Sequence, residues 1–301
     1  MKTLTSLLLI ALCAVGTSCV GSRKMSGARE RLNTIKETQA LEASQVKQIS
    51  STTQKKLKDN KIDSIINSRF DFRVGRIHIE IDSVSGEIAF LDSLMANKKD
   101  FRKTYKNIII PKLATLDSFR NESLKRKQVY LMLEDGINTA NYTLFDLAAF
   151  FGPGKYAIPE GQEEIATNSF APLVDSVIKF SEKYKNFNQT ATLVILGFAD
   201  GTGFDPQSAL YAELAGLIGK VPVSKQELNK KLSELRALTL IKQLQKQFLS
   251  KTGTGKTAAP VNVEYLAIGK GEELPFSSIS NYKDEDERRR IVLCYWAILP
   301  K

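Results

Sequence analysis

Two charged residues, Asp200 and Arg236, stand where a carboxylate and a guanidinium could together form a binding site. Asp200 follows an apolar run at 193–196 and begins a turn that ends at Gly203. Arg236 lies seven residues after Asn229 in a helical pattern, so these two side chains share one helix face. A carboxylate accepts hydrogen bonds from an ammonium group, and a guanidinium pairs bidentately with a carboxylate. Each residue alone also fits a plainer role, Asp200 as half of an Asp-Gly turn and Arg236 as a solvated helix residue.

These side chains need a strand and a helix to bring them together. The apolar centre of 190–197 predicts a central strand. Ser224 and Glu227 have the spacing of a capping box, which predicts a helix from there to about 248. The remaining patterns predict strands at 142–151, 261–269 and 291–299, a short helix at 207–217, and a helix up to about 184 that Pro172 kinks or delays. This order predicts a C-terminal α/β layer domain over 138–301, with helices on one face of a small sheet.

The N-terminal half is predicted to be mainly helical. Apolar residues recur at helical steps from 28 to about 67, and further helices are expected at 85–94 and at 101–133, the last interrupted near Pro111. Between them, 73–82 alternates with period two and predicts a strand. No catalytic motif lies in 28–137, so we expect a stalk, or a surface for a protein partner or for self-association.

Composition excludes several functional classes. The chain has 301 residues, a net charge of +10 and a single histidine, His78, which is expected to be exposed. One histidine cannot build a multi-histidine metal site, and we find no Ser-His or Cys-His catalytic arrangement around it. We therefore expect no metal, no cofactor and no enzyme activity, although counting histidines leaves a carboxylate-based hydrolase open. The run 252–257 resembles a phosphate-binding loop, but Ser250 stands where that motif needs glycine, and the loop precedes a strand. The positive charge is compatible with an acidic polymer or with a solvated surface, and we do not expect nucleic acid as a partner.

The N-terminus resembles a bacterial lipoprotein signal. Lys2 is followed by an apolar run at 7–15, by small residues at 16–18, and by Cys19. Nine apolar residues are too few to span a bilayer as a helix. The resemblance implies that 1–18 is removed, that Cys19 is acylated with chains such as palmitate, and that 19–27 is a tether. An ordinary secretory signal is the alternative, and both imply export. Cys294 then remains as a lone cysteine, expected in a buried strand.

The residues of the C-terminal half resemble the OmpA-like domain family. The resemblance covers about the last 160 residues and rests on a specific order of short motifs. These are Pro159-Glu160-Gly161, Gly197, Asp200, Gly203, Asn229, Leu232-Ser233, Arg236-Ala237 and Arg289-Arg290. It implies an α+β fold, a βαβαββ two-layer sandwich preceded by the helical region.

The resemblance also implies a function, which is non-covalent binding of peptidoglycan. In that family the aspartate holds the ammonium and the arginine the carboxylate of the stem-peptide diaminopimelate. Carried over, Asp200 and Arg236 take these roles, with Asn229, Gly203 and Ser233 completing the site. With Cys19 in the lipid, the protein would link the periplasmic face of the outer membrane to the cell wall.

This chain departs from the family pattern in three places. Phe198-Ala199 replaces the frequent His-Thr, an insertion occupies about 204–225, and Arg288 stands where Asn or Asp is common. The second functional hypothesis is therefore an envelope scaffold or assembly protein. In that hypothesis the OmpA-like domain no longer binds the wall, and the helical half binds a partner.

Overall fold

The computed structural model describes residues 2–145, 151–253, 262–276 and 278–301, with side chains from residue 21 onward. Within it the chain forms two compact units. The helical unit comprises Met1–Ser51 and Asp71–Leu131, and the sheet unit comprises Thr52–Phe70 and Met132–Lys301. Residues 52–70 lie within the predicted helical stalk of 28–137, but they fold with the sheet.

The sheet unit has the α+β order that the sequence predicts. Over the described residues the order is β1 (Asn141–Phe145), α6 (Glu163–Lys183), β2 (Gln189–Gly197), α7 (Ala209–Ile218), α8 (Lys225–Thr252), β3 (Val263–Gly269) and β4 (Val292–Pro300). The four strands lie in the order β1-β4-β2-β3. Strand β4 is antiparallel to both β1 and β2, whereas β2 and β3 are parallel. The βαβαββ prediction is confirmed, and α7 is the helix of the insertion.

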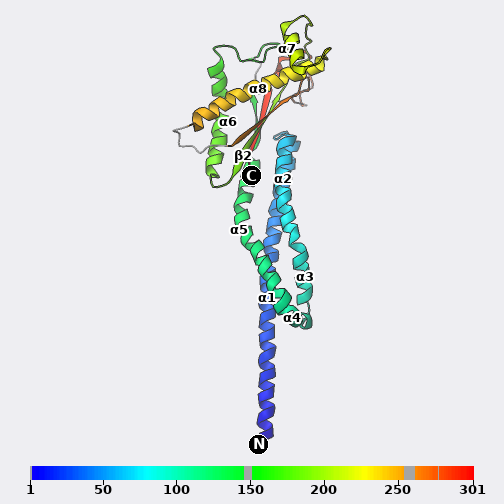
Figure 1. The fold of residues 1–301 in the computed structure, drawn as a ribbon, viewed down its shortest axis with the longest axis vertical. Helices are drawn as coiled ribbons and strands as arrows, with labels where there is room; N and C mark the ends of the chain where they lie inside the picture. The colour runs from blue at the N-terminus through cyan, green and yellow to red at the C-terminus, as the bar shows by residue number, and fades with distance from the viewer. Residues whose placement is uncertain (1, 146–150, 254–261, 277) are drawn as a thin grey trace. The chain divides into compact units, whose positions relative to one another are not determined.

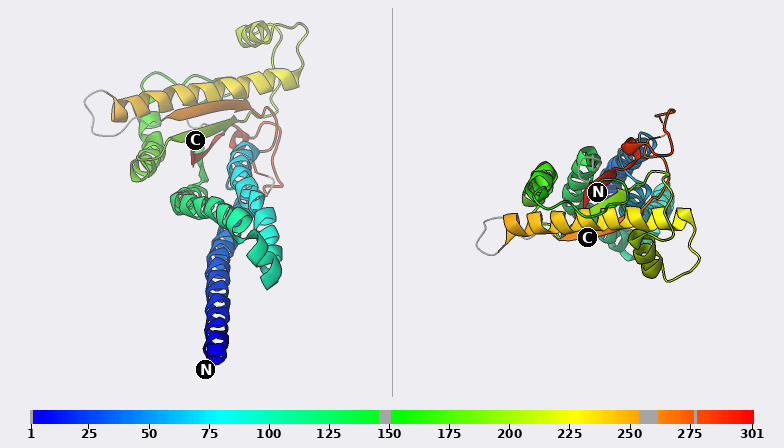
Figure 2. Two further views of the ribbon diagram at one scale, coloured as in Figure 1. Left: turned by 60° about the horizontal axis from the view of Figure 1, so that its bottom comes forward. Right: turned by 90° about the horizontal axis from the view of Figure 1, so that it is seen from above.

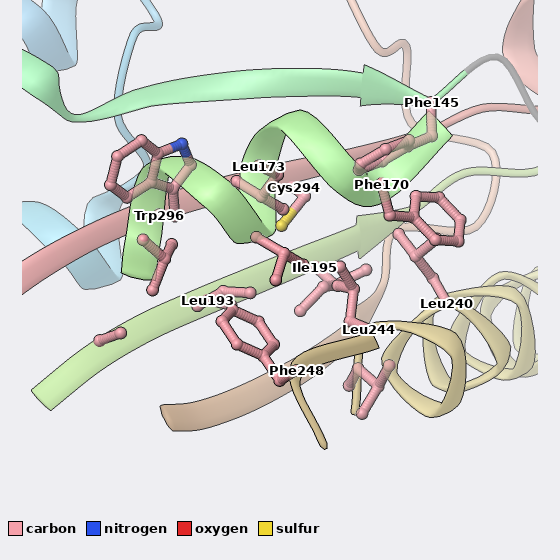
Figure 3. Close-up of a cluster of buried hydrophobic side chains, with 14 of the residues drawn as sticks. Phe145, Phe170, Leu173, Leu193, Ile195, Leu240, Leu244, Phe248, Cys294 and Trp296 are labelled. Carbon is pink, nitrogen blue, oxygen red and sulfur yellow. The ribbon is translucent and has the colours of Figure 1, made fainter. Parts of the chain in front are cut away.

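Helices α6 and α8 cover one face of this sheet (Figures 1 and 2). Figure 3 shows the core between them, where Phe170 of α6 and Leu244 of α8 meet Ile195 of β2 and Cys294 of β4. Alternate residues of β4 from Val292 to Ile298 point into this core. Cys294 is fully buried as expected, and burial raises the pKa of its thiol. Helix α6 runs through Pro172 without a delayed start.

The opposite face of the sheet is covered by residues 52–70. All nine residues of β4 are buried, which requires cover on both faces. Ile62, Ile66 and Phe70 are buried, and Arg69 pairs with Glu264 of β3 at 2.7 Å. Lys56 Nζ donates to the carbonyls of residues 138 and 140, both at 2.7 Å. The tip of the α1–α2 hairpin is therefore part of the sheet domain.

The helical unit is built from α1 (Lys2–Lys58), α2 (Ser64–Ser83), α3 (Ser85–Met95), α4 (Lys98–Thr104) and α5 (Ile110–Thr139), parts of which extend into the sheet unit. Its core joins residues of α1, α3 and α5, among them Leu32, Ile35, Leu91 and Leu113. The helices predicted at 28–67 and 85–94 are present, although the first ends at Lys58 and α2 begins at Ser64. The interruption near Pro111 is a π-helical turn, Tyr105–Ile109, directly before α5.

The strand prediction for 73–82 is wrong, because this segment lies in α2. Its alternation also contains helical spacing: Val74, Ile77 and Ile81 are buried at steps of three and four, while Ile79 is 70% exposed. The segment 19–27, predicted as a tether, is helical within α1. The end of the predicted strand 142–151, the start of 261–269 and most of the loop at 251–260 lie outside the described residues.

We found no helix among the described residues that is both long and apolar enough to cross a membrane.

Candidate functional site

The site lies where the carboxyl ends of β2 and β3 meet the first turns of α8. Gly197 ends β2, and a Cβ atom there would lie 1.9 Å from the carbonyl oxygen of Ser233. Gly269 ends β3, and a Cβ atom there would lie 2.1 Å from the carbonyl oxygen of Lys230. Only glycine permits so close a backbone approach. Helix α8 begins with the predicted capping box, in which Ser224 and Glu227 bond reciprocally. Together the glycines and the cap fix where Arg236 enters the site.

Arg236 is buried, with 1% of its surface exposed, and is held by backbone carbonyls. Its Nε donates to the Lys155 carbonyl and its Nη1 to the Phe198 carbonyl, both at 3.0 Å. A guanidinium has five N–H groups, so three remain, and Nη2 has no hydrogen-bond partner among the described residues. Burial, opposed by Asp200 and reinforced by Arg290, lowers the pKa of Arg236 to about 10. The group therefore remains charged at neutral pH.

Asp200 is 5% exposed and lies close enough to Arg236 to raise the pKa of that guanidinium. The two do not form a direct ion pair. Asp200 Oδ2 instead accepts from Nε of Arg290, just before β4, and Oδ1 accepts from the Thr202 backbone N–H at 3.3 Å. The insertion between 204 and 225 thus does not keep Asp200 and Arg236 apart. The site carries two guanidinium groups around one carboxylate.

Arg290 was not among the predicted site residues, although its Arg-Arg pair is part of the family resemblance. It lies 90 positions from Asp200 in sequence, and no local pattern predicts that contact. Its neighbour Arg289 is also buried and donates to the carbonyls of residues 272, 283 and 284. The backbone N–H of Gly201 donates to the Asp284 carbonyl, so the loop before β4 packs against the Asp200 turn.

Asn229 and Ser233 are buried in the site and bonded within the protein. Asn229 Nδ2 donates to Glu272 Oε1 at 2.7 Å and to the Thr202 carbonyl at 3.4 Å. Ser233 Oγ donates to the Lys230 carbonyl and accepts from the Gly271 N–H, both at 2.9 Å. These bonds tie α8 to the turn after β2 and to the loop after β3. Gly203 has open space where a side chain would be, so neither its φ angle nor a neighbour requires glycine.

The insertion contacts the segment that supplies one carbonyl to Arg236. Helix α7 packs against α8 through a small core that includes Leu214, Val223 and Leu228. Tyr156, next to Lys155, donates a hydrogen bond to Glu213 of α7. A Cβ atom at Gly154, where φ is +68°, would lie 2.9 Å from Leu210 Cδ2. The insertion therefore holds the segment 154–156 in place beside Arg236.

Of the predicted site, the structure brings together Asp200, Arg236, Asn229 and Ser233, with Gly203 in the adjoining turn. The arrangement can bind an anion at the remaining N–H groups of Arg236. It can bind a cation at lone pairs of Asp200 that Arg290 and Thr202 leave unused. Cys19 precedes the residues whose side chains the structure describes, so its prediction stands on the sequence alone.

Comparison with known proteins gives only distant similarities. No protein-family model matches the chain, and no curated protein matches it. Among solved structures it is similar to the periplasmic domain of Helicobacter pylori MotB, with 12% identity and a TM-score of 0.30 over 52% of this chain and 76% of that chain. It is also similar to a putative MotB-like protein from Desulfovibrio vulgaris, with 15% identity and a TM-score of 0.30 over 54% of this chain and 76% of that chain. Values this low do not identify a family or a function.

Proposed function

We propose that the sheet unit binds peptidoglycan non-covalently through the diaminopimelate of the stem peptide. The observation that carries the proposal is the buried Arg236, held by carbonyls at the end of β2 beside Asp200 and with N–H groups to spare. A buried cation normally has an anion or a full set of acceptors. A ligand carboxylate would complete that set, and the sequence resemblance to the OmpA-like family supports the same ligand.

The remaining donors of Arg236 define how a ligand would bind. With Nε and one Nη1 proton engaged, a carboxylate can still approach end-on and accept from Nη1 and Nη2 together. The ligand ammonium would donate to Asp200, which keeps free lone pairs. The two guanidinium groups and the single carboxylate leave the site with a net positive charge. The site therefore favours a ligand that brings more negative than positive charge.

Co-sedimentation of the purified full-length protein with peptidoglycan sacculi tests this proposal. We expect Asp200→Ala and Arg236→Lys each to weaken binding by about 10- to 100-fold, since a hydrogen bond to a charged group contributes about 1.5–3 kcal/mol. Lys at position 236 keeps the charge but cannot reach two carbonyls and a carboxylate at once.

Matched controls lie on the same elements. Asp205→Ala removes an exposed carboxylate from the loop after the site, and Lys242→Ala removes an exposed cation from α8. Both variants should bind like the wild type. Equal binding by the wild type, Asp200→Ala and Arg236→Lys, with unchanged thermal unfolding, would exclude this site.

The protein is further proposed to be anchored to the outer membrane through an acylated Cys19. Stable anchoring needs more than one acyl chain, which the lipoprotein modification supplies. Metabolic labelling with a clickable fatty acid should mark the wild type and not Cys19→Ser. Labelling of both proteins would refute acylation at this residue.

The alternative is a scaffold or assembly protein that does not bind the wall. The pairing of Asp200 with Arg290 favours it, because the aspartate already has a charged partner within the protein. The co-sedimentation experiment separates the two functions, since a scaffold would not be retained by sacculi in any of these variants.

A further inference from the structure

A groove on the helical unit combines exposed leucines with cations that have no partner within the described residues. It has a volume of about 310 Å³ and is lined by residues of α1 and α5. Leu41 on the α1 wall is 68% exposed, and Leu124 on the α5 wall is 72% exposed. A single exposed leucine is common on protein surfaces, but two facing each other across one groove form an apolar contact site.

The carboxylate that lines the groove is buried and already paired with an arginine. Glu42 is 3% exposed and accepts from Arg126 Nε at 3.1 Å and from Nη2 at 3.0 Å. Arg126 also lies over the ring of Phe119, 4.6 Å from its centroid, and Tyr130 beside it is buried. The only carboxylate that lines the groove is therefore already neutralised.

The rim is positively charged. Arg120 and Lys127 are exposed on α5 and line the groove on either side of Leu124. Neither forms an ion pair with another described residue, whereas neighbouring Lys125 pairs with Glu122 at 2.7 Å. Among the described residues that line it, the groove thus presents two unpaired positive charges and no unpaired negative charge.

The spacing of these residues specifies the shape of an occupant. Arg120, Leu124 and Lys127 stand at i, i+4 and i+7, so they form one stripe along α5. The two cations are about 10 Å apart along the helix axis, since each residue rises about 1.5 Å. A helix lying along this stripe would match it with two carboxylates seven residues apart and one apolar residue between them.

We propose that this groove docks an acidic amphipathic helix of a protein partner. The apolar side chain of that helix inserts between Leu41 and Leu124, and its carboxylates pair with Arg120 and Lys127. The inference is independent of peptidoglycan binding, because every residue involved belongs to the helical unit.

Photo-crosslinking in cells tests the proposal with the full-length protein. A photoreactive amino acid replaces Ser123, which lines the groove, or Gln128, which is exposed on the same helix outside the groove. We expect a protein crosslink from position 123 well above that from position 128. The crosslinked peptide should carry two acidic residues seven apart with an apolar residue between them.

The synthetic form of that peptide is then titrated against the purified full-length protein. The double variant Arg120→Glu/Lys127→Glu should weaken its binding at least tenfold, and Leu124→Ser should also weaken it. The matched variant Lys242→Glu/Lys246→Glu on α8 makes the same charge change elsewhere and should bind within twofold of the wild type.

Four outcomes of the crosslinking experiment would overturn the proposal. These are equal crosslinking from positions 123 and 128, a crosslink to a second copy of this chain, a crosslink to lipid, and a crosslinked peptide without acidic residues. Equal loss of binding in the groove variant and the α8 variant would also overturn it, because a general charge effect would then explain the result.

Discussion

Two of the largely buried arginines, one in each unit, are used in opposite ways. In the helical unit, Arg126 pairs with Glu42 through two nitrogens, and its Nη1 lies 3.5 Å from Glu80. In the sheet unit, Arg236 bonds only to two backbone carbonyls. Both lie near a phenylalanine ring, Phe119 at 4.6 Å and Phe151 at 6.0 Å.

The pKa shifts of Arg126 and Arg236 differ because their hydrogen-bond partners differ. Burial disfavours the charge of both arginines. At Arg126, Glu42 together with Tyr130 and Glu80 outweighs burial and raises the pKa, whereas the pKa of Arg236 falls to about 10. An arginine whose N–H groups pair with a carboxylate stabilises the fold and has few N–H donors left for a ligand. An arginine satisfied by carbonyls is positioned by the fold and keeps its charge for an incoming anion. The comparison can be tested by four experiments, beginning with the largest expected effect.

Glu42→Ala should cost the most stability. Removing one partner of a buried ion pair typically costs about 3–5 kcal/mol, and Arg126 would keep only the more distant Glu80 as a charged partner. Chemical denaturation followed by circular dichroism measures the change. The exposed pair Lys125–Glu122 is the matched control, and Glu122→Ala should cost less than about 1 kcal/mol. Similar costs for the two variants would contradict a structural role for Glu42.

Lysine substitutions at the two arginines should have opposite consequences. Arg126→Lys loses one hydrogen bond of the bidentate pair and should destabilise the protein by about 1.5–3 kcal/mol without changing its affinity for sacculi. Arg236→Lys should weaken sacculus binding by about 10- to 100-fold with a smaller effect on stability. Denaturation and co-sedimentation are measured on both variants. If both changed the same property, the two arginines would not differ in role.

The two guanidinium groups should titrate differently at alkaline pH. The pKa of Arg236 is lowered, so this group loses its proton near pH 10 in the folded protein and at a higher pH in the unfolded chain. The unfolded chain then binds more protons between these values, and the contribution of Arg236 to stability increases with pH across that window. Carbon-13 NMR of arginine Cζ should show Arg236 titrating near pH 10. The Arg126 signal should stay unchanged to pH 12, and its titration with Arg236 would contradict the assigned pKa directions.

Tyr156→Phe should have the smallest effect. It removes the hydrogen bond to Glu213 of α7 but keeps the ring, so the Lys155 carbonyl loosens only slightly from Arg236 Nε. We expect hydrogen exchange of the Arg236 Nε–H to accelerate about two- to fivefold, as for the loss of one partly exposed hydrogen bond. Tyr211→Phe in the same small core is the control and should leave the exchange unchanged. Unchanged exchange in Tyr156→Phe would show that the insertion does not position Arg236.

The sequence was most informative where local patterns decide the structure. The apolar run before Asp200 and the capping box at Ser224 and Glu227 placed β2 and α8 correctly, and with them the two charged residues of the site. The period-two pattern at 73–82 misled because Val74, Ile77 and Ile81 also have helical spacing, and burial on one side decides between the two periods.

Contacts between distant residues could not be predicted. The pairing of Asp200 with Arg290 depends on the loop before β4 folding back onto the turn after β2. Likewise, apolar spacing at 62–70 predicts a helix with one buried side, but it does not say which surface that side meets. The structure shows that it meets the second face of the sheet.

The position of β4 has a consequence for how the sheet domain forms. It is the last of the four strands in sequence, yet it lies between β1 and β2 and is hydrogen-bonded to both. Strands β1 and β2 therefore do not pair with each other. Neither can complete its hydrogen bonding until residues 292–300 are in place. If such a chain crossed a membrane with its N-terminus first, this domain would stay unfolded until almost the whole chain had crossed.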